Sequence, residues 1–119
     1  DVQTAHKQWY FGKSLDGFTP IGPCIVTADA FADYPPRLGI RSFVNGEKRQ
    51  DSNTALQIFD IDHVIAELSQ GMTLKAGTII ATGTPAGVGM GMDPPQFLKP
   101  GDVVRCEIDG IGTLTNPVK

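Results

Sequence analysis

One stretch near residue 80 limits most strongly what this chain can fold into, because it joins an apolar run to a loop crowded with glycine. The run, residues 78–81, is rich in β-branched residues and bounded by glycines, which predicts a buried strand. The loop that follows, residues 82–89, carries three glycines, a proline and the hydroxyls of Thr82 and Thr84. Glycine permits close backbone approach or positive φ, and threonine offers uncharged polar contacts. The stretch therefore predicts either a site-forming loop delivered by a rigid strand or a tight turn that binds nothing.

Turn signals divide the remainder of the chain into short strands. Asn45-Gly46 and Asp109-Gly110 are hairpin signals, since a type I′ turn requires positive φ at both central positions. The expected strands are residues 24–27, 38–44, 47–51, 103–108 and 111–116. This punctuation predicts a mainly β, α+β fold rather than a bundle of long helices.

One helix is expected, over about residues 60–70. Asp60 stands as its N-cap, apolar residues follow at helical spacing, and Gly71 marks its end. Val2, Ala5 and Trp9, spaced three and four apart, indicate a further helical turn at the start of the chain. A short helical turn is also possible at residues 96–98.

Length, charge and cysteine content narrow the class of protein. A chain of 119 residues favours a single domain with enough buried surface for a core. The net charge of −3 and the pI near 5.1 argue against nucleic-acid and anionic-membrane partners. No apolar run has the length of a membrane span and no signal peptide is recognised. Cys24 and Cys106 lie far apart, which suggests reduced core thiols in a cytoplasmic protein. The start at Asp1 suggests a fragment, a processed product or a trimmed chain.

Several groups of polar residues are candidates for a catalytic or ligand-binding site. Gly12-Lys13-Ser14 lacks the upstream glycine of a phosphate-binding loop. Asp60 and Asp62 open the expected helix, so capping and the helix dipole account for them better than a metal ion. His6 and His63 are too far apart for a zinc site. Lys13 stays open: it is either a surface lysine or an ammonium that stabilises an enolate or carboxylate.

With these residues identified, the chain resembles the fumarylacetoacetate hydrolase (FAH) family, specifically the C-terminal part of its bacterial-type members. These include fumarylpyruvate and acylpyruvate hydrolases, oxaloacetate decarboxylases, and isomerase/decarboxylases that act on 2-hydroxyhepta-2,4-diene-1,7-dioate. The resemblance rests on short blocks in the family's order: Gln8-Trp9, Gly12-Lys13-Ser14-Leu15-Asp16, Pro20-Ile21-Gly22-Pro23, Val44-Asn45-Gly46-Glu47, Gln50-Asp51-Ser52-Asn53-Thr54, residues 77–89, Phe97-Leu98-Lys99-Pro100-Gly101-Asp102, Glu107-Ile108, Gly110-Ile111-Gly112 and Asn116-Pro117-Val118.

The resemblance implies a fold, a cofactor and a class of reaction. The fold would be the family's mixed β-sandwich or β-roll, with residues 1–119 as one domain that forms the C-terminal part of the catalytic domain. The cofactor would be Mg²⁺ or Mn²⁺, at which a small keto acid or 1,3-dicarbonyl binds. The metal would stabilise the enolate formed on C–C hydrolysis, decarboxylation or keto–enol isomerisation, reactions typical of aromatic compound catabolism. The resemblance also implies a homodimer.

Carried over by position, the resemblance assigns roles to four residues. Lys13 matches the family lysine that projects into the site, and Gln3 matches a glutamine that hydrogen-bonds the substrate. Thr84, next to Gly83, matches the threonine that contacts a substrate carboxylate or carbonyl. The family's metal ligands, a Glu-x-Glu pair and an aspartate, lie upstream of the lysine, and we expect no metal ligand within this chain.

Two hypotheses follow, because the family's metal ligands are not found in this sequence. The parent protein is expected to be a metal-dependent keto-acid hydrolase, isomerase or decarboxylase of which this chain alone is inactive. The alternative is a catalytically silent, truncated FAH-like scaffold or dimerisation partner.

Overall fold

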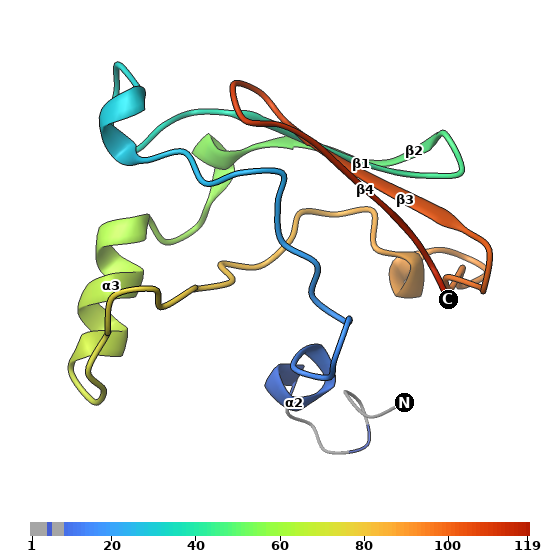
Figure 1. Ribbon diagram of the computed structural model, residues 1–119, viewed down its shortest axis with the longest axis horizontal. Helices are drawn as coiled ribbons and strands as arrows, with labels where there is room; N and C mark the ends of the chain where they lie inside the picture. Colours follow the sequence, from blue (N-terminus) through green and yellow to red (C-terminus); the bar gives the residue numbers. More distant parts are fainter. Residues whose placement is uncertain (1–4, 6–8) are drawn as a thin grey trace.

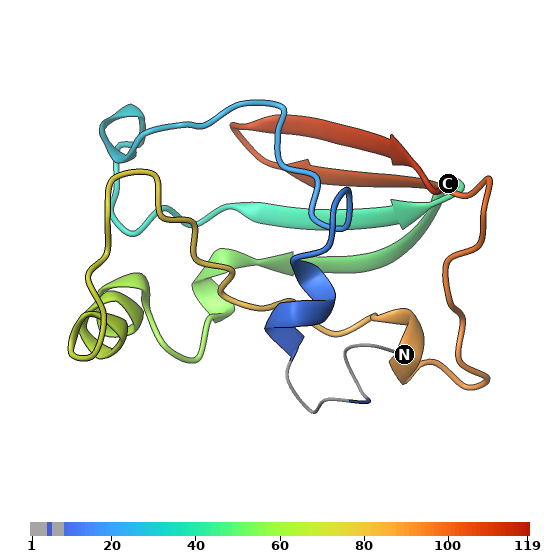
Figure 2. The same cartoon turned by 60° about the horizontal axis from the view of Figure 1, so that its bottom comes forward.

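An antiparallel sheet of four strands forms the centre of the structure, a computed structural model that describes residue 5 and residues 9–119 (Figure 1). Its strands are β1 (Gly39–Val44), β2 (Glu47–Asn53), β3 (Val103–Ile108) and β4 (Gly112–Pro117). They lie in the order β2-β1-β3-β4, so two sequential hairpins meet along β1 and β3. The chain between the hairpins, residues 54–102, runs below the sheet (Figures 1 and 2).

Both predicted hairpins are confirmed, but in the second turn only Gly110, with φ 75°, and not Asp109 has the positive φ of a type I′ turn. In the first turn Asn45 has φ 52° and Gly46 has φ 85°, as a type I′ turn requires. The side chain of Asn45 also reaches the next hairpin: its Nδ2 donates to Asp102 Oδ1 at 2.8 Å, and its Oδ1 accepts from the amide of Val103 at 2.9 Å. The Asn45 side chain therefore fixes the first hairpin against the start of β3.

The register of β2 slips by one residue opposite β1. Ser42 pairs with Gln50, whereas the next residue, Phe43, pairs with Lys48. Arg49 is thus the extra residue of a β-bulge, a feature that re-aims side chains. Because of the bulge, Arg49 and Gln50 both line the hollow below the sheet, although they are consecutive.

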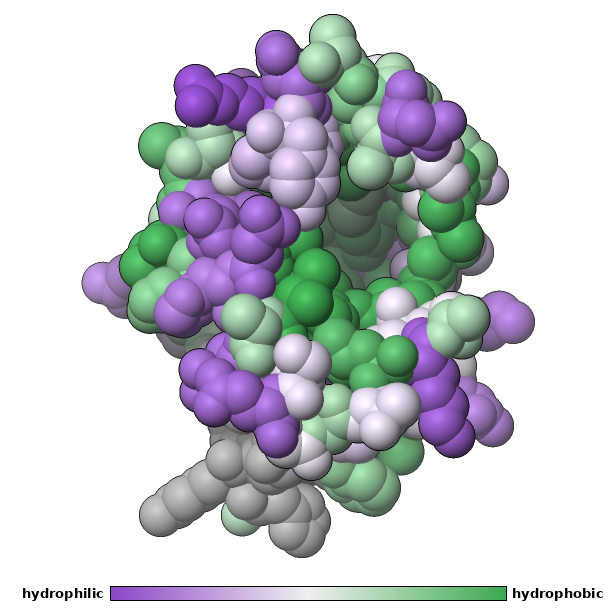
Figure 3. All heavy atoms as spheres, turned by 90° about the vertical axis from the view of Figure 1, so that its left-hand side faces the viewer, coloured by the Kyte–Doolittle hydropathy of each residue, from purple (hydrophilic) through white to green (hydrophobic). Residues whose placement is uncertain are grey.

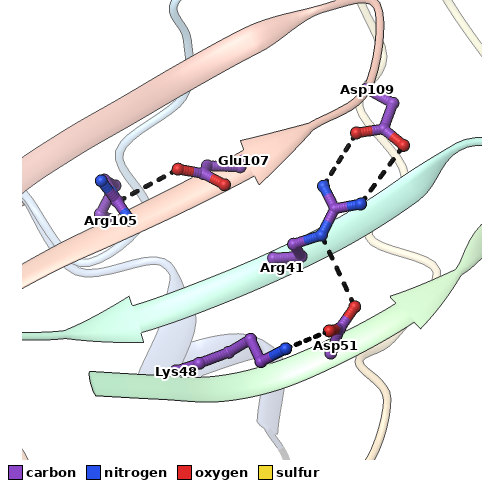
Figure 4. Close-up of polar contacts among 6 residues, drawn as sticks. All are labelled: Arg41, Lys48, Asp51, Arg105, Glu107 and Asp109. Atoms are coloured by element: carbon purple, nitrogen blue, oxygen red, sulfur yellow. Dashed lines mark hydrogen bonds and ion pairs between the residues drawn. The ribbon is translucent and has the colours of Figure 1, made fainter. Parts of the chain in front are cut away.

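The two faces of the sheet differ in chemistry because side chains alternate along each strand. One face carries ion pairs (Figure 4): Arg41 contacts Asp109 at 2.8 Å and Asp51 at 3.6 Å, and Arg105 contacts Glu107 at 3.2 Å. All of these side chains are partly exposed, so each pair contributes little to stability. The opposite face is the one turned toward the rest of the chain. Ser42, Val44, Gln50, Val104 and Cys106 line the hollow on that side, together with the charged Arg49 of the bulge.

The helical content is small. The predicted helix is confirmed as α3 (Ile61–Ser69), with the carboxylate of Asp60 accepting from the amide of His63 at 2.8 Å. The amide of Gly71 bonds the carbonyl of Leu68 just past its end. A short helix, α2 (Trp9–Lys13), begins at the last residue of the turn expected over Val2, Ala5 and Trp9, and most of that expected turn, Val2 included, lies outside the described residues. Three 3₁₀ turns complete the set: η1 (Ala28–Ala30), η2 (Thr54–Leu56) and η3 (Gly89–Gly91).

Two predicted strands and one predicted turn are wrong. Residues 24–27 and 78–81 carry no strand, and Ile25 and Ile79 are 85% and 69% exposed. A strand is defined by a hydrogen-bonded neighbour, and no described strand lies alongside either segment. Residues 96–98 are irregular, and the 3₁₀ turn forms earlier, at η3.

Large apolar side chains are exposed over much of the surface. Among the described residues none of the apolar side chains is fully buried, and Ile58 is 92% exposed. Figure 3 shows apolar side chains around a hollow on the face seen from the α3 side. Cys24 and Cys106 are free but exposed, so the prediction that they belong to a core is wrong in this chain. None of the helices in the described part of the chain is long and apolar enough to cross a membrane.

The Asp102 carboxylate predicts a pH dependence. Hydrogen bonds from the Asn45 side chain and the Lys99 amide lower the pKa of Asp102 below 3.8. Its contribution to stability is therefore present above the ordinary pKa and is lost as the pH falls through the lowered one. We expect Asp102→Asn to lower the urea midpoint at pH 7 and to differ less from wild type at pH 2.5. Asp33→Asn, at an exposed loop position, is the control; a pH-independent Asp102→Asn difference would contradict the assignment.

Candidate functional site

The glycine loop, residues 82–89, is held against β2 by side-chain amides. Gln50 Nε2 donates to Thr84 Oγ1 at 2.6 Å and to the carbonyl of Pro85 at 2.9 Å. Behind it, the hydroxyl of Ser42 on β1 donates to Gln50 Oε1 at 2.8 Å. A second glutamine, Gln57, donates to Thr82 Oγ1 at 3.2 Å. Both loop threonines therefore accept a hydrogen bond from an amide fixed outside the loop.

The bulge residue Arg49 anchors the segment that follows this loop. Its guanidinium, in a side chain only 17% exposed, bonds Gln96 Oε1 and lies 3.0 Å from the sulfur of Met92 and 3.3 Å from a Glu47 oxygen. The Arg49 Nε is buried and has no partner among the described residues. Adjacent residues of β2 thus hold both ends of the segment from Thr84 to Gln96.

One glycine lets this segment approach β2 closely, and a second lets the segment fold back on itself. A Cβ on Gly87, which has φ +105°, would collide with the carbonyl oxygen of Arg49. A Cβ on Gly89 would collide with the carbonyl oxygen of Gln96, while the Gly89 carbonyl accepts from the Gln96 amide at 2.9 Å. Close backbone contact thus explains the glycines at positions 87 and 89.

A hollow of about 660 Å³ lies between the sheet and this segment. Its polar lining includes Arg49, Lys99 and Asp102, and its apolar lining comes from residues such as Val44, Phe97 and Val104. Lys13 and Thr84 do not line it, so the hollow lies behind the loop rather than at the predicted site.

The structure places the predicted site residues as follows. Thr84 and Gly83 are exposed on the loop, and Gly83 has φ +101°. Lys13 is exposed at the end of α2, which lies on the same side of the sheet as the loop (Figure 1). Within the described residues, no hydrogen bond joins Lys13 to Thr84; the Lys13 carbonyl instead accepts from the hydroxyl of Thr19 at 2.5 Å. Gln3 lies outside the described residues.

Acidic residues do not gather into a metal site in the described part of the chain, where no three His, Cys, Asp or Glu side chains converge. Asp60 caps α3, and Asp62 accepts a hydrogen bond from the Tyr34 hydroxyl at 2.8 Å. That bond and the nearby negative charge raise the pKa of Tyr34. The ring of His63 stacks on Phe59 at 4.8 Å. The residues present therefore do not fit a metal ion by themselves.

No motif in the sequence assigns a role to the residues that position the loop, Ser42, Arg49, Gln50 and Gln57. The indication for Gln50 in the sequence is that it is a neutral polar residue between two charged ones, in a strand that follows a hairpin turn. Its partner could not be identified, because the loop it contacts lies more than 30 positions later in the sequence.

Comparison with known proteins gives the family. A family model described as "Fumarylacetoacetate (FAA) hydrolase C-terminal" matches residues 1–119, so the chain belongs to the fumarylacetoacetate hydrolase family. It is 50% identical over 118 residues to the oxaloacetate tautomerase YisK of Bacillus subtilis, covering 99% of this chain and 39% of that protein. It is 52% identical over 112 residues to the mitochondrial oxaloacetate tautomerase fahd2 of Xenopus laevis, covering 94% of this chain and 35% of that protein.

Solved structures agree in fold. A fumarylacetoacetate hydrolase from Exiguobacterium antarcticum superposes with TM-score 0.92 at 54% identity, over 100% of this chain and 42% of that one. A maleylpyruvate hydrolase from Sphingobium sp. SYK-6, solved with manganese(II) and pyruvate, gives TM-score 0.78 at 44% identity, over 91% of this chain and 38% of that one. The expected family and its mainly β fold are confirmed. The chain spans about two-fifths of the length of these relatives.

The close approach of Gly87 to β2 predicts that alanine at position 87 destabilises the fold more than alanine at Gly83, which has open space around it. Gly83→Ala adds a methyl group in open space at positive φ, with an expected cost of about 1–2 kcal/mol from backbone strain alone. Gly87→Ala pays a similar strain and also collides with the Arg49 carbonyl, which adds about 1–3 kcal/mol. Urea unfolding of the two variants measures the difference, and equal midpoints would show that the loop does not contact β2 in solution.

Proposed function

We propose that this chain forms the substrate-binding wall of a divalent-metal-dependent enzyme that interconverts the keto and enol forms of a 2-oxo acid of the oxaloacetate type. Two relatives at 50% and 52% identity are oxaloacetate tautomerases, which supports this reaction. The pyruvate held by the related maleylpyruvate hydrolase is also a 2-oxo acid, which supports this substrate class. C–C hydrolysis and decarboxylation are alternative outcomes of the same assay.

The observation that carries the proposal is the set of hydrogen-bond donors on the glycine loop. The oxygens of an ionised 2-oxo acid only accept hydrogen bonds. Thr84 is exposed, and in the described part of the chain no backbone amide of residues 82–88 donates to another group. An ammonium such as that of Lys13 adds positive charge for an oxygen that becomes negative as the enolate forms. Donors on the loop therefore match the acceptors of the substrate.

The divalent ion requires residues beyond those described. No described cluster fits it, so its ligands are proposed to lie in the upstream part that the relatives carry and this chain does not match. A divalent ion held by such residues would supply Lewis acid chemistry for a substrate carbonyl. The chain itself is proposed to bind and orient the carboxylate and carbonyl oxygens through Thr84 and Lys13.

A silent scaffold is the second candidate. It is favoured by one observation, the lack of any group of three potential ligand side chains among the described residues. The two candidates differ in whether a polypeptide that also carries the upstream segment shows turnover.

Metal titration is the first test. We expect the 119-residue chain to show no stoichiometric binding of Mn²⁺ or Mg²⁺ by calorimetry and no turnover, since it offers no set of converging ligands. The polypeptide with the upstream segment is the comparison, and we expect it to bind about one ion per chain. Tight stoichiometric binding by the short chain would overturn the proposed division of the site.

Kinetics of the longer polypeptide with oxaloacetate are the second test. Lys13→Met should lower kcat by about 10²–10³-fold, the scale of one lost donor to a developing oxyanion. Thr84→Val should weaken substrate binding by about tenfold or more, the scale of one hydrogen bond to a charged group. Lys75→Met, at an exposed lysine outside the loop, is the matched control and should change neither. Wild-type activity in the Lys13 and Thr84 variants would sink the proposal, and an inactive wild type would favour the scaffold.

A further inference from the structure

The orientation of the Gln50 amide follows from the chemistry of its neighbours. The Pro85 carbonyl, 2.9 Å from Gln50 Nε2, can only accept a hydrogen bond. The nitrogen of the amide must therefore face the loop, and the amide oxygen must face Ser42, whose hydroxyl donates to it at 2.8 Å. A flipped amide would place its oxygen against the Pro85 carbonyl oxygen, with no proton between the two acceptors.

The orientation of the Gln50 amide determines whether the Thr84 hydroxyl donates or accepts in its hydrogen bond with Gln50. One hydrogen of Gln50 Nε2 serves the Pro85 carbonyl, and the other points at Thr84 Oγ1, 2.6 Å away. A hydroxyl that accepts from an amide keeps its own proton for another acceptor. No acceptor for that proton lies among the described residues, and Thr84 is exposed.

We propose that Ser42 and Gln50 are positioning residues that make Thr84 a hydrogen-bond donor, and so select a ligand that presents an acceptor oxygen at this loop. The selected group is a carboxylate or carbonyl oxygen, because a ligand with an amide nitrogen in its place leaves the Thr84 proton without an acceptor. The inference rests on the proposed function, because it assumes that Thr84 contacts the substrate. It goes beyond that function by assigning the selectivity to an amide on the neighbouring strand.

A purely mechanical role for Gln50 is the competing explanation, since its bond to Pro85 also clips the loop to β2. Two variants separate the explanations. Gln50→Met removes the bonds to Ser42, Thr84 and Pro85 and leaves the Thr84 hydroxyl free to rotate. Gln50→Glu offers only acceptor oxygens, so it draws the Thr84 proton inward and repels the Pro85 carbonyl.

The test uses the polypeptide with the upstream segment, with pyruvate binding by calorimetry and kcat and KM for oxaloacetate as readouts. We expect Gln50→Met to weaken pyruvate about tenfold and Gln50→Glu to weaken it more, up to about 100-fold. In a Thr84→Val background neither Gln50 change should weaken pyruvate further, because the donor is already gone. Gln70→Met, on the exposed end of α3, is the matched control.

Different results overturn different claims. Weak binding in Thr84→Val with normal binding in both Gln50 variants overturns the positioning role and leaves the proposed function intact. Normal binding in Thr84→Val overturns the proposed function. If both Gln50 variants lose the same affinity for pyruvate, and this loss persists in the Thr84→Val background, then Gln50 only holds the loop against β2 and the inference is overturned.

A variant of Ser42 decides the matter if the Gln50 variants fail to fold. Ser42→Ala removes only the bond that holds the amide oxygen, and should weaken pyruvate about threefold with an unchanged melting temperature. Ser42→Thr keeps the hydroxyl and should restore binding. Unchanged binding in Ser42→Ala overturns the inference.

Discussion

The amide of Gln50 is the contact on which the arrangement of the candidate site depends. It joins three parts of the chain, because it accepts from Ser42 on β1 and donates to Thr84 and Pro85 in the glycine loop. No apolar side chain among the described residues is fully buried, so hydrophobic packing within this chain does little to place the loop. Directional polar contacts and close backbone approach do so instead, and they define distance and orientation together.

The bulge at Arg49 makes this arrangement possible. In a regular strand, consecutive side chains point to opposite faces, so only one of residues 49 and 50 could face the loop. The extra residue lets Gln50 hold the start of the segment while Arg49 bonds Gln96 at its end. The opposite face of the sheet keeps its exposed ion pairs undisturbed (Figure 4).

Features with local causes could be predicted from the sequence, and features with distant causes could not. The Asn45-Gly46 turn and the Asp60 cap depend on residues within a few positions, and both form as predicted. Residues 78–81 read as a strand but lack a neighbour that would complete one. In the candidate site, the exposed position of Thr84 on a loop was predictable from glycine and proline, whereas its bond to Gln50 depends on a one-residue register slip.

The exposed apolar surface fits a chain that matches about two-fifths of its relatives' length. We propose that side chains such as Ile58, Phe59 and Phe97 pack against parts of the fold that the longer relatives contain and this chain does not match. Covering them would provide the hydrophobic stabilisation that the described part lacks.

The tie between β2 and the glycine loop also bears on protein engineering. Transplanting residues 82–89 alone into another scaffold would carry over the threonines and glycines but leave behind the amide that orients them. The recipient would need a bulged strand with the equivalents of Ser42 and Gln50 at the same depth. The strand and the loop therefore form one functional unit, and a loop exchange among homologues should transfer both together.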